Sequence, residues 1–141
     1  MQIGVESSRA VENKRVFVVD GDEITRAVLQ FVLHDDYETH EFAELSRAYD
    51  KAVDSKPDAV LLAIDLVEVH GAAVITEMRA RIAGVRIAVV CDRADDPAAR
   101  RCLGRGVHSL LAKPLTIESV RHKVDLLLGR RSALKIPIQV L

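Results

Sequence analysis

Polar residues whose side chains could carry chemistry stand directly after four apolar runs: Asp20-Gly21-Asp22, Ala63-Ile64-Asp65, Cys91-Asp92 and Lys113-Pro114. Carboxylates are the hard oxygen ligands that Mg²⁺ and Ca²⁺ prefer, so Asp20, Asp22 and Asp65 are the candidates for a cation site. The lysine ammonium can pair with a carboxylate or with a phosphoryl oxygen. A thiol such as that of Cys91 is nucleophilic where its surroundings favour the thiolate.

Length and composition point to one globular domain with a neutral charge balance. The chain has 141 residues, of which 49% are hydrophobic and 4% aromatic, so we expect an aliphatic core. The formal net charge is -1, which gives no overall field for nucleic acid or an anionic membrane. The N-terminus lacks an apolar signal region and no apolar run reaches membrane-spanning length, so we expect a cytoplasmic protein.

The cysteines and histidines do not have the spacing of a metal or disulfide framework. Cys91 and Cys102 form no C-x-x-C motif, and no two of the five histidines are four residues apart. We therefore expect no structural metal and no resident cofactor.

Five strand-forming runs recur along the chain: RVFVV (15–19), YETHEF (37–42), DAVLLA (58–63), VRIAVV (85–90) and VHSLLA (107–112). Three of them are nearly continuous apolar runs, as in strands that are covered on both faces of a parallel sheet. The second run alternates polar and apolar residues, which indicates an edge strand.

Residues at helical spacing fill the gaps: Ile24, Val28 and Val32; Ala48, Ala52 and Val53; Val74, Met78 and Ile82; the segment DDPAARRCLG; and Ile117, Val120, Val124, Leu127 and Leu128. The order is therefore β-α five times, which predicts an α/β fold with a doubly wound parallel sheet. Ligands and chemistry collect beyond the carboxyl ends of such strands, where the four polar segments stand.

Taken together, the segments VFVVDGDEITR, PDAVLLAIDLVEVHG, RIAVVCD and GVHSLLAKP resemble the receiver domain of bacterial response regulators over residues 13–129. The resemblance implies a flavodoxin-like, CheY-like (βα)₅ fold with a five-stranded sheet in the order 2-1-3-4-5. It also implies a cis peptide bond between Lys113 and Pro114.

A working receiver domain transfers a phosphoryl group from a histidine kinase to its own aspartate, with the help of a divalent cation. By this resemblance, Asp20 matches the first acidic residue, while Gly21 replaces the second, which binds the metal. The acceptor position, six residues after Pro57 and eight before Gly71, falls on Ala63.

The remaining positions of the phosphorylation pocket are also altered. The switch hydroxyl falls on Cys91 and the aromatic on Leu110, and Lys113 alone is kept. A methyl group cannot accept phosphate, and the missing carboxylate lowers the affinity for Mg²⁺. The resemblance thus implies a pseudo-receiver in a two-component phosphorelay, which has no catalytic residue and acts through protein contacts.

Each surviving polar residue also has a plainer interpretation. Asp65 is either a solvated loop carboxylate or, in the alternative, the phosphoacceptor in a changed register. Asp20 and Asp22 are interpreted as caps of the following helix rather than cation ligands. Lys113 can pair with Asp20 or Asp65, and Cys91 is interpreted as a small buried filler rather than a reactive thiol.

A third hypothesis is a flavodoxin-like nucleotide or cofactor binder. The first β-α turn of such a protein is rich in backbone donors for phosphate. The turn here reads DGDE and repels phosphate.

The expected partners are a fused output domain or another protein, such as a histidine kinase. A homodimer would form through the fourth and fifth predicted helices, which follow residues 85–90 and 107–112. We expect no nucleic acid or membrane contact by this domain. Residues 1–12 are predicted to be a tail. Residues 130–141 are either a second tail or the start of a further module, since Arg131 and Lys135 resemble the opening of a PilZ domain.

Overall fold

The computed structural model describes residues 13–130 of the chain. The predicted tail 1–12, and residues 131–141 of the predicted tail 130–141 with the PilZ-like start, lie outside these residues. Within them no helix combines the length and the apolar character that a membrane crossing requires.

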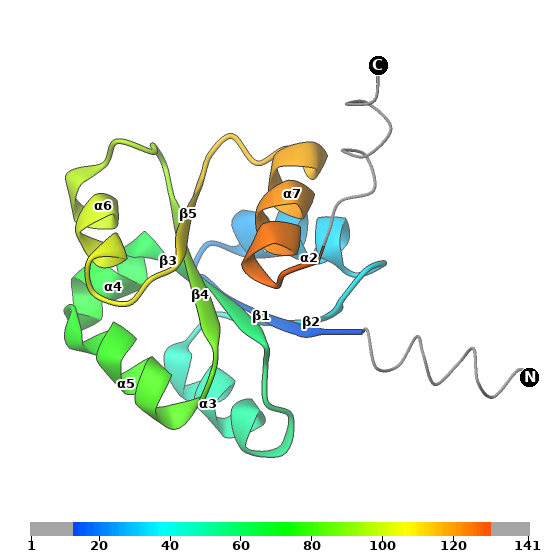
Figure 1. Cartoon of the computed structure of the whole chain (residues 1–141), viewed down its shortest axis with the longest axis horizontal. Coiled ribbons are helices and arrows are strands. Elements are labelled where there is room, and N and C mark those ends of the chain that lie inside the picture. Colours follow the sequence, from blue (N-terminus) through cyan, green and yellow to red (C-terminus); the bar gives the residue numbers. More distant parts are fainter. Residues whose placement is uncertain (1–12, 131–141) are drawn as a thin grey trace, which may run out of the picture.

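Strands and helices alternate along the chain in the predicted order (Figure 1). The strands are β1 (Arg15–Val19), β2 (Glu38–Phe42), β3 (Ala59–Ala63), β4 (Arg86–Cys91) and β5 (Ser109–Ala112). The helices are α2 (Glu23–Leu33), α3 (Leu45–Asp54), α4 (Ile64–His70), α5 (Ala73–Arg81), α6 (Pro97–Leu103) and α7 (Ile117–Leu127).

The five strands form one parallel sheet in the order β2-β1-β3-β4-β5. This order confirms the predicted doubly wound α/β fold and places β2 at an edge. The burial of the strands differs accordingly. Every residue of β3, which lies inside the sheet, is buried, whereas β2 is only partly covered. The peptide bond between Lys113 and Pro114 is cis, as the resemblance implied.

Two apolar clusters cover the two faces of the sheet, because alternate residues of a strand point to opposite sides. Phe17 and Val19 of β1 lie in the cluster beneath α3, α4, α5 and α6. Val16 and Val18 lie in the other, beneath α2 and α7. The helices in Figure 1 are divided between the same two faces.

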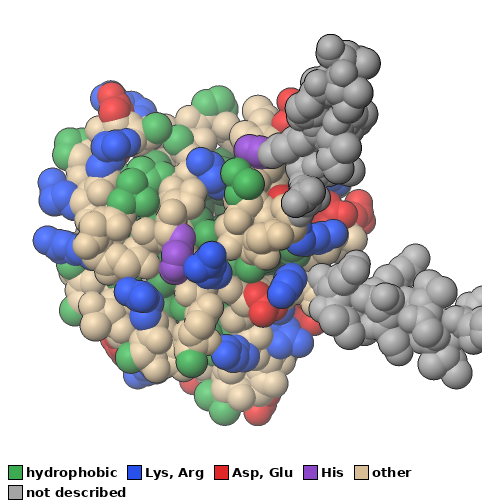
Figure 2. Space-filling view, viewed as in Figure 1, with side chains coloured by type: hydrophobic (Ala, Val, Ile, Leu, Met, Phe, Trp, Pro, Cys, Tyr) green, Lys and Arg blue, Asp and Glu red, His purple; other side chains and the backbone are tan. Residues whose placement is uncertain are grey.

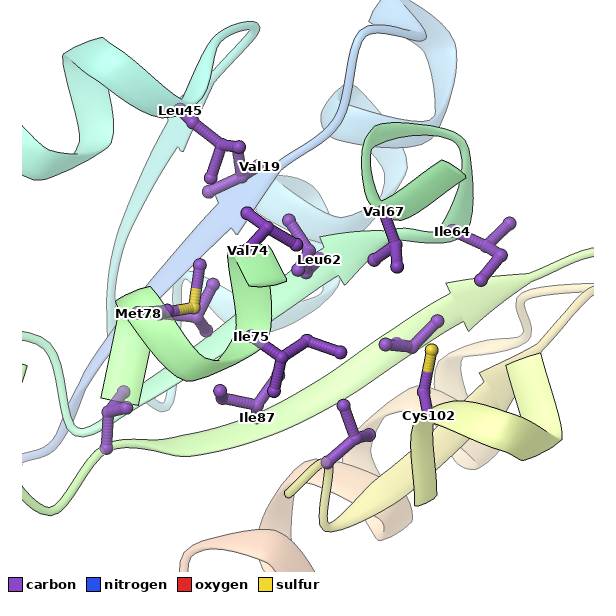
Figure 3. Packing of buried hydrophobic residues seen from close by; sticks show 14 of the residues in the cluster. Val19, Leu45, Leu62, Ile64, Val67, Val74, Ile75, Met78, Ile87 and Cys102 are labelled. Carbon is purple, nitrogen blue, oxygen red and sulfur yellow. The ribbon is translucent and has the colours of Figure 1, made fainter. Parts of the chain in front are cut away.

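The larger cluster holds α5 and α6 against the centre of the sheet. Ile75 and Met78 of α5 lie over Leu62 of β3 and Ile87 of β4, and Cys102 of α6 approaches β4 from the side (Figure 3). All five side chains are at most 3% exposed, so this packing is close to that of a protein interior.

Two predictions about helices are wrong. Residues 64–70, expected to form an acidic loop, form helix α4, which ends where Gly71 adopts a positive φ of 89°. Ile24, placed on the buried stripe of its helix, is 73% exposed. Val32 of the predicted stripe is buried as expected, and Thr25, Leu29 and Leu33 complete the buried face of α2.

The predicted apolar stripes of the next and last helices are also partly wrong. Val53 is 84% exposed and Ile117 is 50% exposed. Val53 lies in the last turn of α3, and Ile117 is the first residue of α7. The stripe therefore holds for the central turns of each helix and fails at these ends.

Candidate functional site at the carboxyl edge of the sheet

The parallel strands bring the four polar segments to one edge of the sheet. Asp20 follows β1, Ala63 and Cys91 are the last residues of β3 and β4, and Lys113 follows β5. Backbone hydrogen bonds extend the ladder at this edge, because Lys113 N donates to Cys91 O over 2.9 Å and Asp20 N donates to Phe42 O over 3.0 Å. The predicted grouping at a common edge is therefore present.

Asp20 is the buried acid of this edge. Its residue is 7% exposed, and its Oδ1 accepts a hydrogen bond from Asp22 N over 2.8 Å. Burial raises the pKa of Asp20, while the Asp22 N–H and the charge of Lys113 counteract part of that rise. Asp20 thus fixes the turn that leads into α2 and does not cap the helix itself.

Asp22 is the N-cap of α2, as predicted. Its Oδ2 accepts hydrogen bonds from both the backbone N–H and the hydroxyl of Thr25. The Thr25 hydroxyl, followed by the Thr25 N–H, holds the pKa of Asp22 below its usual value. One oxygen of Asp22, Oδ2, is therefore engaged in capping the helix.

Ala63 stands where the acceptor was expected. It is 4% exposed, and its Cα lies opposite Val90 of the neighbouring strand. Ala63 also occupies the N-cap position of α4, without a side-chain hydrogen bond to that helix. The position offers a methyl group and no oxygen.

Sterics do not require glycine at Gly21, which the family resemblance matches to the second acidic position. A Cβ at this position would meet no atom within 4 Å. Its φ is not among the positive glycine values of residues 13–130. A larger residue would fit here, so the missing carboxylate does not follow from a lack of space.

Asp65 lies in the first turn of α4 and is exposed. The expectation that it stands on a loop is wrong, because Ile64 and Val67 bury one face of a helix in the same segment. An acidic residue in the first turn stabilises the helix dipole. The spacing of Ile64 and Val67, followed by Gly71, was the sequence signal for this helix.

Lys113 has a different partner from the ones predicted. Its Nζ lies 3.4 Å from Asp92 Oδ1, the residue directly after β4. The predicted pairing with Asp20 or Asp65 is wrong, although the charge of Lys113 still acts on Asp20. Strands β4 and β5 are neighbours, so the residues following them meet more readily than those following β1 and β5.

Cys91 and Leu110 contribute packing. The Cys91 residue is 1% exposed, and burial raises the pKa of its thiol, with the charges of Asp96 and Asp92 acting in the same direction. A thiol held in its neutral form is a poor nucleophile. Leu110 packs against the larger apolar cluster.

Few side-chain ligands for a divalent cation stand at this edge of the sheet. Within residues 13–130, no three His, Cys, Asp or Glu side chains form a group that could hold a metal ion. One oxygen of Asp20 and one of Asp22 accept hydrogen bonds from backbone or hydroxyl donors, and Gly21 has no side-chain ligand to offer.

A parallel five-stranded sheet in the order 2-1-3-4-5 is shared by flavodoxin-like proteins and receiver domains, so the fold alone does not choose between them. The family model of the response regulator receiver domain matches residues 16–125. The chain belongs to this family. A receiver domain is a signalling module rather than a catalytic enzyme, and its class interacts with histidine kinases and output domains.

Curated relatives include the transcriptional regulatory protein PrrA of Mycobacterium leprae, which is 32% identical over 126 residues. The match covers 87% of this chain and 53% of that protein. PrrA of Mycobacterium tuberculosis is 31% identical over 126 residues, and this match also covers 87% of this chain and 53% of that protein. The chain thus spans about half the length of these relatives.

Solved structures share the fold at lower identity. A response regulator from Thermotoga maritima has a TM-score of 0.75 at 19% identity, covering 83% of this chain and 98% of its own. A putative response regulator from Chloroflexus aurantiacus has a TM-score of 0.74 at 22% identity, covering 84% and 99%.

Proposed function

We propose that this receiver domain signals without accepting a phosphoryl group and acts through contacts with other proteins. The observation that carries the proposal is Ala63 at the end of β3, where the family resemblance places the acceptor aspartate. Gly21 supports the proposal, because it lacks the carboxylate that would bind Mg²⁺. Without that ion, the negative charge of a phosphoryl group would not be neutralised. The domain is proposed to work in the cytoplasm, as part of a two-component pathway.

The proposed contact surface lies on α6 and α7. Each helix exposes large apolar side chains to solvent: Leu103 is 38% exposed, Leu126 57% and Ile117 50%. A protein partner that covers these side chains would remove their apolar area from water. The partner is proposed to be an output domain, a histidine kinase or a second copy of this chain.

The test of phosphorylation uses acetyl phosphate and, separately, beryllofluoride, each with Mg²⁺. Intact-mass spectrometry of the wild type should show no added phosphoryl group, and calorimetry should show no Mg²⁺-dependent beryllofluoride binding. A phosphoryl adduct on any aspartate, or saturable beryllofluoride binding, would overturn the proposal. If an adduct appears and is lost in Asp65→Asn, Asp65 is the acceptor and the alternative hypothesis replaces ours.

A reconstituted variant supplies the positive control. Gly21→Asp combined with Ala63→Asp restores both missing carboxylates, and position 21 has room for the added side chain. We expect this double variant to bind beryllofluoride with Mg²⁺ under conditions in which the wild type does not. Circular dichroism checks that it folds, because a carboxylate at the buried position 63 costs stability when no cation is present.

The contact surface has a separate test. Sedimentation of the wild type and of Leu126→Ser measures self-association through α7. A homodimer on this surface should weaken in the variant, and a wild type that remains monomeric at high concentration would remove self-association from the proposal.

A further inference from the structure

A positively charged hollow lies at the amino ends of β4 and β5, the sheet edge opposite to Asp20 and Lys113. Its volume is about 400 Å³, and it is lined by Arg79, Ala80, Gly84, Val85, Arg86 and His108. The last turns of α5 and the starts of β4 and β5 build it. The site described above involves none of these residues, and the family resemblance gives none of them a role in phosphoryl transfer.

Arg79 is held over a backbone that has no side chain. A Cβ at Gly106 would lie 2.5 Å from Arg79 Nη1 and 3.0 Å from its Cδ, so the guanidinium occupies space that any other residue would fill. Gly106 has a φ of 113°, a conformation that suits glycine. The missing side chain of Gly106 and its positive φ thus allow Arg79 to lie along this side of the hollow.

Arg86 is anchored by one nitrogen. Its Nε donates to Leu127 O over 3.3 Å, at the end of α7. Within residues 13–130, this is the one side-chain hydrogen bond that Arg86 makes, so its terminal nitrogens keep their capacity to donate. The position of the guanidinium is therefore restricted before any ligand arrives.

His108 presents a donor of known tautomer. Its Nδ1 accepts a hydrogen bond from Ile87 N over 3.0 Å, so the neutral ring carries its proton on Nε2. Burial lowers the pKa of His108, and the charges of Arg86 and Arg79 lower it further. An anion between the three side chains would offset this repulsion.

No acid lines the hollow, and within residues 13–130 neither arginine nor His108 forms an ion pair with a carboxylate. Figure 2 shows this face, on which a histidine and several Lys or Arg side chains gather near the amino ends of β4 and β5. Two arginines and a histidine thus lie around one hollow without a carboxylate to balance their charge, although the net charge of the chain is -1.

We propose that this hollow binds a small organic phosphate. Guanidinium groups donate in a planar fork that matches phosphate oxygens, and the His108 Nε2–H supplies a further donor. The volume lies in the range of small-ligand sites and exceeds the needs of a phosphate group alone, which leaves room for an organic part over Val85 and Ala80. Because Arg86 also holds the last turn of α7, the ligand would act on one helix of the proposed contact surface.

The experiment follows the His108 ring resonances by NMR while inorganic phosphate, and then pyrophosphate, is added at constant ionic strength. We expect a saturable shift for both anions, with pyrophosphate binding more tightly, and a higher His108 pKa in the bound state.

Matched arginine variants decide between a site and general charge screening. Arg79→Gln should weaken pyrophosphate binding by about tenfold, the usual effect of losing a charged donor. Arg47→Gln, which removes the same charge from an exposed position of α3, should leave binding unchanged. A linear shift that sodium chloride reproduces, or equal losses in both variants, would overturn the proposal. Thermal melts show whether each variant is folded.

Discussion

Asp20 accepts a hydrogen bond from the backbone N–H of Asp22 over 2.8 Å, and Asp22 in turn caps α2. Two acids that were candidates for binding a cation thus stabilise the turn between β1 and the start of α2. Each has a consequence for stability that can be measured separately, because burial raises the pKa of Asp20 while hydrogen bonds from Thr25 lower that of Asp22.

We expect Asp20→Asn to increase stability at neutral pH. Asp20 binds a proton more tightly in the folded protein than in the unfolded chain. The folded protein therefore loses stability as the pH rises from about 4 through the raised pKa of Asp20. Asparagine keeps an oxygen that can accept the Asp22 N–H and carries no charge. Urea unfolding at pH 7 and pH 4 should show a gain that shrinks at the lower pH, and an equal gain at both would contradict the burial effect.

Asp22→Ala should lower the free energy of unfolding by about 0.5–2 kcal/mol, since it removes the side-chain cap of α2. Asp96 offers the matched control, because it holds the N-cap position of α6 without a side-chain hydrogen bond to that helix. Asp96→Ala should therefore change stability by less than about 0.5 kcal/mol. Chemical denaturation of both variants measures the difference, and equal losses would contradict the capping role.

The same substitution at two isoleucines should separate core from surface. Ile75→Ala removes a side chain that is 0% exposed and should cost about 2–5 kcal/mol. Ile24→Ala acts on a residue that is 73% exposed and should change stability by less than about 0.5 kcal/mol. A large loss at Ile24 would show that its side chain is covered in solution.

Glu38 should make the protein sensitive to acid. Arg15, through two hydrogen bonds, and then His40 lower the pKa of Glu38 to about 2. This stabilisation is complete above the usual glutamate pKa and is lost as the pH falls from there towards 2. Solvent screening keeps the effect small, because the Glu38 side chain is 39% exposed.

The test compares the wild type with Glu38→Gln by urea unfolding between about pH 5 and pH 2. Glutamine cannot titrate, so the variant should lose stability less steeply with acid than the wild type. Identical slopes in the two proteins would show that the Arg15–Glu38 pair is not formed in solution.

The local pattern identified β3 closely because its burial is uniform. The run DAVLLA was expected at 58–63, and β3 spans Ala59–Ala63. A strand covered on both faces needs apolar residues at every position, and few other structures do. Helix α4 was missed because its seven residues follow β3 directly, with no polar turn between them. Its polar residues Asp65, Glu68 and His70 suit an exposed loop as well as the exposed face of a short helix.

The sequence by itself determined which residues stand at the strand ends, since the β-α order and the spacing from Pro57 and Gly71 place Ala63 without any coordinates. It also indicated that Asp22 begins a helix, because capping depends on neighbours along the chain.

Only the tertiary structure decided which residues that are distant in the chain come into contact. Lys113 meets Asp92 because β5 lies next to β4, and Arg79, Arg86 and His108 line one hollow because the turns at Gly84 and Gly106 lie at the same sheet edge. Such contacts join residues that are distant in the chain, and their geometry depends on strand register and helix packing. Composition and spacing carry no record of either.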